Sequence, residues 1–494
     1  MTEPTAPIAT TTAGSVRGIT RDGVHVFRSI PYAAPPVGSR RFRPPEPALP
    51  WSEIRDATRF GPVAPQQPSM LETIMGGPEP VIDEADCLTL TVFTPGLDDA
   101  RRPVLFWIHG GAFVIGTGAT PIYDGRRFAT HGDCVVVSIN YRLGAFGFLH
   151  LEEIFGAAFT GSGNVGILDQ VLALEWVRDN IAGFGGDPER VTIFGESAGG
   201  MSVGTLLGTP AAQGLFAQAI VQSGGGSFCL PAATATDIAR DVLAEAGIGS
   251  VAELESASVD AILAAQSKVL AARTSTDLAF MPVVDGHVLP ERPVDAVADG
   301  LGAVPTMIGT NQDEMTLFTV LDLGLGELDG NVVNEALAAS FGDRADDVSA
   351  GYTALHPEVS PTDLLTVIAT DRVFRIPAIR LAEAGIAHRP TYMYLFTWES
   401  PALDGKLKSC HALELPFVWD AIDRPGLSVL TGDGPERRPL ADAMHAAWIA
   451  FARTGDPGWP AYDLERRATQ RFDTTLEVLD DPEGAQRELW IEPS

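Results

Sequence analysis

Four short apolar runs, rich in β-branched residues, recur in the first 200 residues of the chain. They are Leu88–Phe93, Val104–Ile108, Cys134–Ile139 and Val191–Phe194. Runs of this kind, bounded by glycine-containing turns, are typical of parallel strands that are buried on both faces. Between the third and fourth runs, apolar residues at 168, 171, 172, 174, 177 and 181 follow helical spacing. This alternation of strands and helices predicts an α/β architecture with a large, mostly parallel sheet.

The rest of the chain extends this pattern. Val304–Ile308 and Thr391–Phe396 are predicted to be further strands, and runs near 13–19 and 23–27 predict an opening hairpin. Residues 232–275 and 331–390 are rich in Ala, Asp and Leu with helical spacing, so we expect helical insertions there. No internal repeat divides the sequence, and we expect residues 1–494 to form a single domain.

The chain is strongly acidic, with 34 basic and 64 acidic residues and a formal net charge of −30. A surface of this charge repels phosphate backbones and anionic lipid, so binding to nucleic acid or to a membrane is not expected. No apolar run approaches the roughly 18 residues that a membrane-spanning helix needs. The N-terminus lacks a secretory pattern, and the cysteines lack metal-ligand spacing. We therefore predict a cytoplasmic protein with reduced thiols and no bound metal.

The strongest chemical signal is Gly195-Glu196-Ser197-Ala198-Gly199, which follows an apolar strand and precedes a helix start. A Gly-x-Ser-x-Gly sequence in this context predicts a tight strand-to-helix turn that exposes the serine hydroxyl. Small residues at 195 and 199 let the strand and the helix approach closely. The amide of Ala198 would then face a developing oxyanion, aided by the helix dipole.

A second glycine-rich turn, His109-Gly110-Gly111-Ala112, follows the run Val104–Ile108. Loops of this type supply the other amides of an oxyanion hole, which we assign to Gly110 and Gly111. Glycine is needed there because a side chain would block the substrate carbonyl. His109 is expected to orient the loop rather than to titrate during catalysis.

A nucleophilic serine needs a general base, and histidine serves best near neutral pH. The chain order Ser, acid, His leaves five histidines after Ser197, and His411 is favoured because it follows the predicted strand Thr391–Phe396 on a loop. The acid should follow Val304–Ile308, where Asp313 and Glu314 are neighbours. Residue patterns alone do not separate these two carboxylates.

At these residues the chain resembles the carboxylesterase/cholinesterase family (type-B carboxylesterases) of the α/β-hydrolase fold, and most of all its bacterial para-nitrobenzyl esterases. The resemblance spans nearly the whole chain. The matching blocks are Phe184-Gly185-Gly186-Asp187-Pro188 with the serine motif, Asp86-Cys87-Leu88, Ile30-Pro31-Tyr32-Ala33, Asn140-Tyr141-Arg142, Gly163-Asn164-Val165-Gly166, Gln222-Ser223-Gly224 and His411-Ala412-Leu413-Glu414-Leu415-Pro416-Phe417.

The resemblance implies which residues act. The family acid corresponds to Glu314 and the family base to His411, while Glu196 and Ser223 resemble residues that support the triad through hydrogen bonds. The implied enzyme is a serine carboxylesterase that forms an acyl-enzyme on Ser197 and needs no metal or organic cofactor. Its implied substrates are small to medium neutral esters, and the His-Gly-Gly-Ala loop resembles the type linked to bulky and tertiary alcohols. The helical insertions are expected to line the pocket.

A hydrolase dedicated to a carbamate, lactone or xenobiotic ester is the alternative, because the same triad serves each of these substrates. A binding module that has kept the fold is the non-enzymatic alternative. Relatives of that kind typically lose the nucleophile, whereas Ser197, Glu314 and His411 are all present here.

The sequence departs from the family pattern at several places, one of which is Met315, where a glycine commonly follows the acid. Ala64 stands where eukaryotic relatives have the disulfide partner of Cys87, so that disulfide is not expected. Ala85 replaces an acid that pairs with the arginine matching Arg41, and Glu84 is a candidate substitute. No Trp occurs between Trp51 and Trp107, where cholinesterases stack a quaternary ammonium group, so we expect poor hydrolysis of choline esters.

Overall fold

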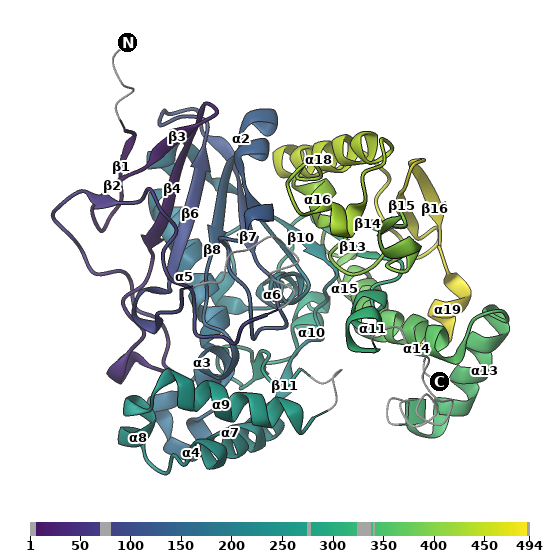
Figure 1. Ribbon diagram of the computed structural model, residues 1–494, viewed down its shortest axis with the longest axis horizontal. Helices are drawn as coiled ribbons and strands as arrows, with labels where there is room; N and C mark the ends of the chain where they lie inside the picture. Colours follow the sequence, from purple (N-terminus) through teal and green to yellow (C-terminus); the bar gives the residue numbers. More distant parts are fainter. Residues whose placement is uncertain (1–5, 70–80, 274–277, 324–336, 339–340, 492–494) are drawn as a thin grey trace.

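The computed structural model describes residues 6–69, 81–273, 278–323, 337–338 and 341–491 (Figure 1). Its main feature is an 11-stranded sheet. In spatial order the strands are β16 (Glu477–Asp480), β15 (Ala468–Phe472), β14 (Thr391–Phe396), β13 (Thr306–Asn311), β10 (Gln218–Gln222), β9 (Gly186–Glu196), β7 (Arg102–Ile108), β8 (Val135–Ile139), β6 (Thr89–Thr94), β4 (Val24–Pro31) and β3 (Ile19–Arg21).

The interior of this sheet is parallel and its two margins are antiparallel. The strands from β8 through β7, β9, β10, β13 and β14 to β15 pair in parallel. At the margins β16, β6, β4 and β3 pair antiparallel with their neighbours. The predicted α/β architecture and its mostly parallel sheet are confirmed. Each predicted apolar run from residue 88 onward contains a strand, with ends that shift by up to five residues.

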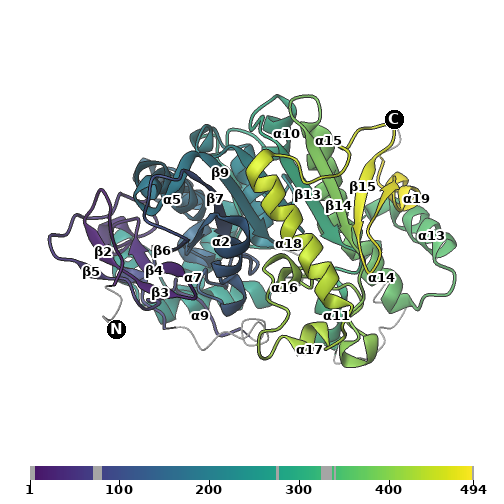
Figure 2. The ribbon, with the colours of Figure 1, turned by 90° about the horizontal axis from the view of Figure 1, so that it is seen from above.

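Helices cover both faces of the sheet. Successive strand residues point to opposite faces, and in the central strands both sets are apolar and must be buried. On β7, Phe106 joins the core cluster beneath one layer, while Leu105 and Trp107 join the cluster beneath the other. Figure 2 shows the two layers on opposite sides of the sheet. One holds α5 (Val165–Asn180), α6 (Ala198–Leu207), α10 (Pro293–Ala298) and α15 (Ile376–Gly385); the other holds α2 (Arg126–Gly132), α16 (Leu415–Val418) and α18 (Arg437–Thr454).

The two regions that the sequence predicts to be helical insertions differ in position. The described part of 232–275 forms helices that pack together at one end of the molecule, beside α3 (Gly144–Phe148) and α4 (Glu152–Phe155) (Figure 1). These helices are α7 (Ala232–Ala246), α8 (Val251–Ser256) and α9 (Val259–Ala271). The described part of 331–390 holds α13 (Ala345–Leu355), α14 (Pro361–Thr370) and α15, and α15 is a crossover helix on the main sheet.

The remaining elements are short. β1 (Ile8–Thr10), β2 (Ser15–Arg17) and β5 (Arg55–Asp56) form a three-stranded sheet, and β11 (Leu230–Pro231) pairs with β12 (Val283–Val284). The predicted run 13–19 therefore divides between two sheets. The helices not yet named are α11 (Thr316–Leu323), α17 (Ser428–Thr431) and α19 (Gly484–Glu488). Among the described residues, no helix has the length and apolar character to cross a membrane.

Candidate active site

Ser197 lies on the sharp turn between β9 and α6. Its backbone angles, φ 57° and ψ −126°, are strained for a residue with a side chain, and such strain gathers at functional sites. A Cβ on Gly195 would lie 2.5 Å from the carbonyl carbon of Gly199, and one on Gly199 would lie 2.0 Å from the oxygen of Ile108. Only glycine fits at these two positions. Ser197 stays partly exposed while both neighbours are buried.

The loop after β7 brings two glycines beside the serine. A Cβ on Gly110 would lie 3.1 Å from the Cβ of Ser197. Gly111 has φ +113°, and a Cβ there would lie 2.2 Å from the carbonyl oxygen of Ile115. Within the described part of the chain, the amides of Gly110, Gly111 and Ala198 donate no hydrogen bond to another protein group. These three N–H groups are therefore available to an oxygen atom beside Ser197.

His109 supports this loop in the way the sequence predicts. Burial lowers its pKa to about 4, so the imidazole is neutral near pH 7. Its Nδ1–H donates to the Gly110 carbonyl over 2.8 Å, and its ring stacks on Tyr141 with 4.5 Å between centroids. Gln66 holds the far side of the loop, because its side chain accepts from the Gly116 amide and donates to the Gly116 carbonyl.

His411 and Glu314 meet directly. The Nδ1 atom of His411 lies 2.6 Å from Oε2 of Glu314, and both side chains are buried. The other carboxylate oxygen of Glu314 accepts from the Ser223 hydroxyl at 2.6 Å and from the Asn311 amide at 2.7 Å. Glu314 is thus held by three donors from separate segments of the chain, and it can fix one orientation of the imidazole.

The neighbouring Asp313 points elsewhere. Its carboxylate accepts from the Ser409 amide at 3.4 Å, and the Lys408 charge acts on it. Burial raises the pKa of Asp313 to about 6. The structure therefore separates the two candidate acids, which the residue pattern alone leaves open: Glu314 faces His411 and Asp313 does not.

Glu196 occupies the other side of the imidazole. Its Oε1 lies 3.0 Å from the Nε2 atom of His411. Burial raises the pKa of Glu196 to about 8. Burial alone would lower the pKa of His411, but the carboxylates of Glu196 and Glu314 outweigh it and raise that pKa to about 9. The hydroxyl of Ser197 makes no hydrogen bond to another described residue, so the serine–histidine bond is not formed here. Oε1 of Glu196 likewise has no hydrogen-bond partner among the described residues, so its contact with Nε2 is one of charge.

A third buried carboxylate, Glu414, was not singled out as functional from the sequence. It accepts from the Gln222 side chain at 3.0 Å and from the Asn311 side chain at 2.8 Å. Gln222 also accepts from the Ser197 amide through its carbonyl, and Asn311 also donates to the Cys410 carbonyl. Glu414 therefore links the loops of Ser197, Glu314 and His411. The sequence did hold a sign of this role, because Glu414 is a charged residue within the otherwise apolar stretch that follows His411.

Two aromatic rings cover the imidazole, and neither was predicted. The ring centroid of Phe374 lies 4.6 Å from that of His411, and Phe318 lies 5.3 Å from it. By contrast, Phe113 is fully buried and packs edge-on against Phe148, so it belongs to the core. The apolar wall beside His411 comes from α11 and from the segment that joins α14 to α15.

The structure shows the surroundings of two of the positions where the sequence departs from the family pattern. Arg41 donates through Nε to Glu84 at 2.7 Å, and its NH2 group forms a second bond with the same carboxylate. Glu84 thus occupies the position of the missing acid at Ala85. The Cys87 thiol is buried and unpaired, and Ala64, also buried, offers no sulfur. Residues 76–78, which replace the tryptophan-bearing loop, lie outside the described residues.

Comparison with known proteins places this site in a family. Residues 5–489 match the carboxylesterase family model. Para-nitrobenzyl esterase of Bacillus subtilis (strain 168) is 39% identical over 98% of this chain and 98% of its own length. Phenmedipham hydrolase of Pseudarthrobacter oxydans is 37% identical over 93% of both chains.

Solved structures agree. Carboxylesterase EST55 of Geobacillus stearothermophilus superposes with a TM-score of 0.89 at 43% identity, covering 98% of this chain and 100% of that one. A PNB esterase structure gives a TM-score of 0.89 at 40% identity, covering 99% and 100% of the two chains. The match in sequence and structure runs through every strand end that carries the site. The chain therefore belongs to the carboxylesterase family, and it is a carboxylic-ester hydrolase of the α/β-hydrolase fold.

Proposed function

We propose that Ser197 is the nucleophile of this esterase, His411 its general base and Glu314 the acid that orients the base. The observation that carries this proposal is the bond of 2.6 Å between His411 and Glu314, on loops that converge beside the strained turn of Ser197. Ser197, Glu314 and His411 follow β9, β13 and β14. The carboxyl ends of parallel strands lie at one edge of a sheet, which is where α/β proteins bind ligands.

The reaction proceeds in two steps. Ser197 Oγ attacks the ester carbonyl while Nε2 of His411 takes the hydroxyl proton. The carbonyl oxygen becomes an oxyanion held by the amides of Gly110, Gly111 and Ala198. His411 then protonates the leaving alcohol. Water, deprotonated by His411, attacks the acyl-enzyme and releases the acid, which restores Ser197.

Glu196 and Ser223 support these groups. Ser223 donates to Glu314 and so keeps the carboxylate turned toward the imidazole. Glu196 faces the imidazole edge that must carry the proton, and its negative form favours the imidazolium.

The substrates are small to medium neutral esters, including esters of bulky or tertiary alcohols. The wall of Phe374 and Phe318 beside His411 suits an apolar group, and glycines at 110 and 111 place no side chain beside Ser197. Residues 1–494 form a single α/β-hydrolase domain, and the helical insertions 232–275 and 331–390 line its pocket. Phe374 supports this for the second insertion, because its ring forms part of the apolar wall beside His411.

The location proposed for the protein is the cytoplasm. All four cysteines are free thiols: Cys87, Cys134, Cys229 and Cys410. Eukaryotic relatives have a disulfide partner for the cysteine that matches Cys87, and Ala64 stands at that partner's position here. Reduced, unpaired thiols are usual in a reducing compartment.

The test is hydrolysis of para-nitrophenyl acetate, butyrate and octanoate by the wild type and by Ser197→Ala. We expect turnover by the wild type and a loss of at least about 10⁴-fold in kcat for the variant. Ser256→Ala, an exposed serine on α8, is the matched control and should keep the wild-type rate. Substantial turnover by Ser197→Ala would overturn the assignment of the nucleophile.

A further inference from the structure

One wide turn of helix joins α14 to α15. Residues Asp371–Arg375 form a π-helical turn in which the Ile376 amide donates to the Asp371 carbonyl, five residues back. Such turns are rare and occur mostly where a helix must present a particular side chain, often at functional sites. We use the name π-turn for Asp371–Arg375.

The inner side of the π-turn touches the proposed catalytic groups. Phe374, at 3% exposure, holds its ring 4.6 Å from the imidazole of His411. Thr370, directly before the π-turn, accepts a hydrogen bond of 3.1 Å from the amide of Met315. Met315 follows Glu314 in the chain, so the same segment contacts both the base and the loop of the acid.

The first residue of the π-turn is held from outside by the C-terminal segment. The indole N–H of Trp490 donates to the hydroxyl of Tyr352 at 2.7 Å. That hydroxyl donates to the carboxylate of Asp371 at 2.5 Å. Tyr352 is fully buried and Asp371 is 2% exposed, so neither can exchange its partner for water without moving. The Trp490 ring is itself held against Phe341, with 4.9 Å between centroids.

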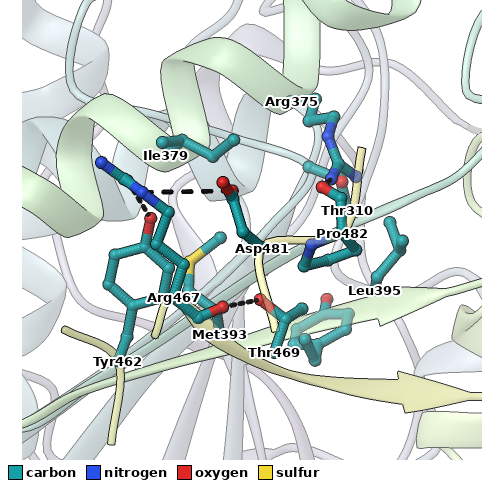
Figure 3. Close-up of a pocket in the computed structure, with 11 residues that line it drawn as sticks. Thr310, Arg375, Ile379, Met393, Leu395, Tyr462, Arg467, Thr469, Asp481 and Pro482 are labelled. Atoms are coloured by element: carbon teal, nitrogen blue, oxygen red, sulfur yellow. Dashed lines mark hydrogen bonds and ion pairs between the residues drawn. The ribbon is translucent and has the colours of Figure 1, made fainter. Parts of the chain in front are cut away.

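The last residue of the π-turn is held by the same segment. Arg375 donates to the Pro482 carbonyl at 2.5 Å and lies 3.3 Å from the carboxylate of Glu483. Figure 3 shows Arg375 beside Pro482, with Asp481 close by on the same C-terminal stretch. Residues 482–490 therefore contact both ends of the π-turn, whose middle carries Phe374.

We propose that Trp490 is a positioning residue of this esterase: through Tyr352 and Asp371 it fixes the π-turn that seats Phe374 on His411. Arg375, with Pro482 and Glu483, is the second half of the same clamp. The inference rests on the proposed role of His411. Release of the clamp lets the π-turn relax, so that Phe374 no longer holds the imidazole at one angle. The consequence falls on the chemical step rather than on substrate binding.

The experiment compares kcat and KM for para-nitrophenyl butyrate in Trp490→Phe and in Trp459→Phe, well below the unfolding temperature of each. Trp459 is the matched control because its buried indole N–H has no hydrogen-bond partner among the described residues. We expect Trp490→Phe to lower kcat roughly three- to tenfold with KM within about twofold, and Trp459→Phe to leave both unchanged. Tyr352→Phe should lower kcat further, because it leaves the Asp371 carboxylate without its donor.

A double-mutant cycle then tests the route. In a Phe374→Leu background, Trp490→Phe should lower kcat by less than about twofold, because the ring that Trp490 positions is gone. An equal loss of kcat from Trp490→Phe in the wild-type and Phe374→Leu backgrounds would overturn the inference. If Trp490→Phe fails to fold, Glu483→Gln tests the clamp at its partly exposed end, and an unchanged kcat there overturns the inference as well.

The same assay separates this inference from the proposed function. If Ser197→Ala is inactive while Trp490→Phe behaves as the wild type, the catalytic proposal stands and the clamp is wrong. If Ser197→Ala retains activity, the catalytic proposal itself fails.

Discussion

His411 is enclosed by carboxylates whose surroundings differ. Glu314 accepts hydrogen bonds from Ser223, the Asn311 amide and the imidazole, so its charge is well matched by donors. Glu196 is buried with less support, and its pKa rises to about 8. Burial, together with the charge of Glu314, raises the pKa of Glu414 to about 7. The negative charge beside the imidazole therefore depends on pH, and so does the capacity of His411 to act as a base.

This arrangement predicts that kcat/KM rises with pH, and that this rising limb of the profile lies at alkaline pH. His411 must be neutral to accept a proton, and its pKa is raised to about 9, so the rate should rise as pH increases toward that value. Glu196→Gln removes a negative neighbour, which should lower the pKa of His411 and move the limb to lower pH by at least about half a unit. Asp313→Asn is the control, since Asp313 does not face the imidazole. An unshifted limb in Glu196→Gln would contradict this account.

Glu414 gives a second prediction at this scale. A glutamine there has only one acceptor oxygen, so either Gln222 or Asn311 would face another N–H group. We expect Glu414→Gln to lower kcat about tenfold with little change in KM, because three catalytic loops lose their common link. Kinetics on para-nitrophenyl butyrate measure this, with the exposed Glu399→Gln as the control. Wild-type kcat in Glu414→Gln would show that the network is not needed for alignment.

At the scale of elements, buried charge pairs tie loops to helices. Arg41 joins the loop of Glu84 to α8, since it also donates to the carbonyls of Leu254 and Ala257. Both side chains of the Arg41–Glu84 pair are 8% exposed. In an intact pair of this kind the mutual attraction offsets the cost of burying both charges, but removal of one partner leaves a buried, uncompensated charge.

Glu84→Gln should therefore lower the free energy of unfolding by about 3 kcal/mol. This loss is at the lower end of the usual range, because the carbonyls of Leu254, Glu255 and Ala257 still accept from Arg41. Urea unfolding followed by tryptophan fluorescence measures the loss. Glu46→Gln breaks the exposed Arg40–Glu46 pair and should change stability by no more than about 0.5 kcal/mol. Equal effects from the two variants would mean that burial of the Arg41–Glu84 pair is unimportant.

At the scale of the whole molecule, the net charge of −30 opposes the compact state through self-repulsion. Many surface arginines form ion pairs, as Arg438 does with Asp420, Asp423 and Asp442. Salt weakens both effects. Because acidic residues exceed basic ones by 30, we expect the relief of repulsion to be the larger effect.

The unfolding temperature should therefore rise by several degrees when NaCl increases from about 0.01 M to about 0.5 M, since the screening length falls from about 30 Å to a few ångström. Scanning calorimetry at pH 7 measures this. Tetramethylammonium chloride at equal ionic strength separates screening from specific sodium binding. A fall in unfolding temperature would show that the surface ion pairs contribute more than the repulsion costs.

The parts of the fold that are hardest to predict lie where strands carry polar residues. β15 includes Thr469, Gln470 and Arg471, and the antiparallel margin strand β16 is partly exposed, so neither shows the apolar run of a central strand. β10 is buried but only five residues long, with a glutamine at each end. Central strands such as β7 and β8 were predictable because both faces are buried, and both faces must then be apolar.

Residue patterns in the chain are enough to predict the chemistry that depends on chain order and on the local backbone. The turn of Ser197, the glycines beside it and the alternation of strands with helices are local features, and each follows from residue type at fixed spacing. Contacts between distant residues appear only in the folded chain. Residue patterns left Asp313 and Glu314 open, and the fold brings Glu314 to His411. It also brings Glu84 to Arg41 and Trp490 to the π-turn. The physical reason is that side-chain direction at the end of a strand is set by packing across the sheet, which no local pattern records.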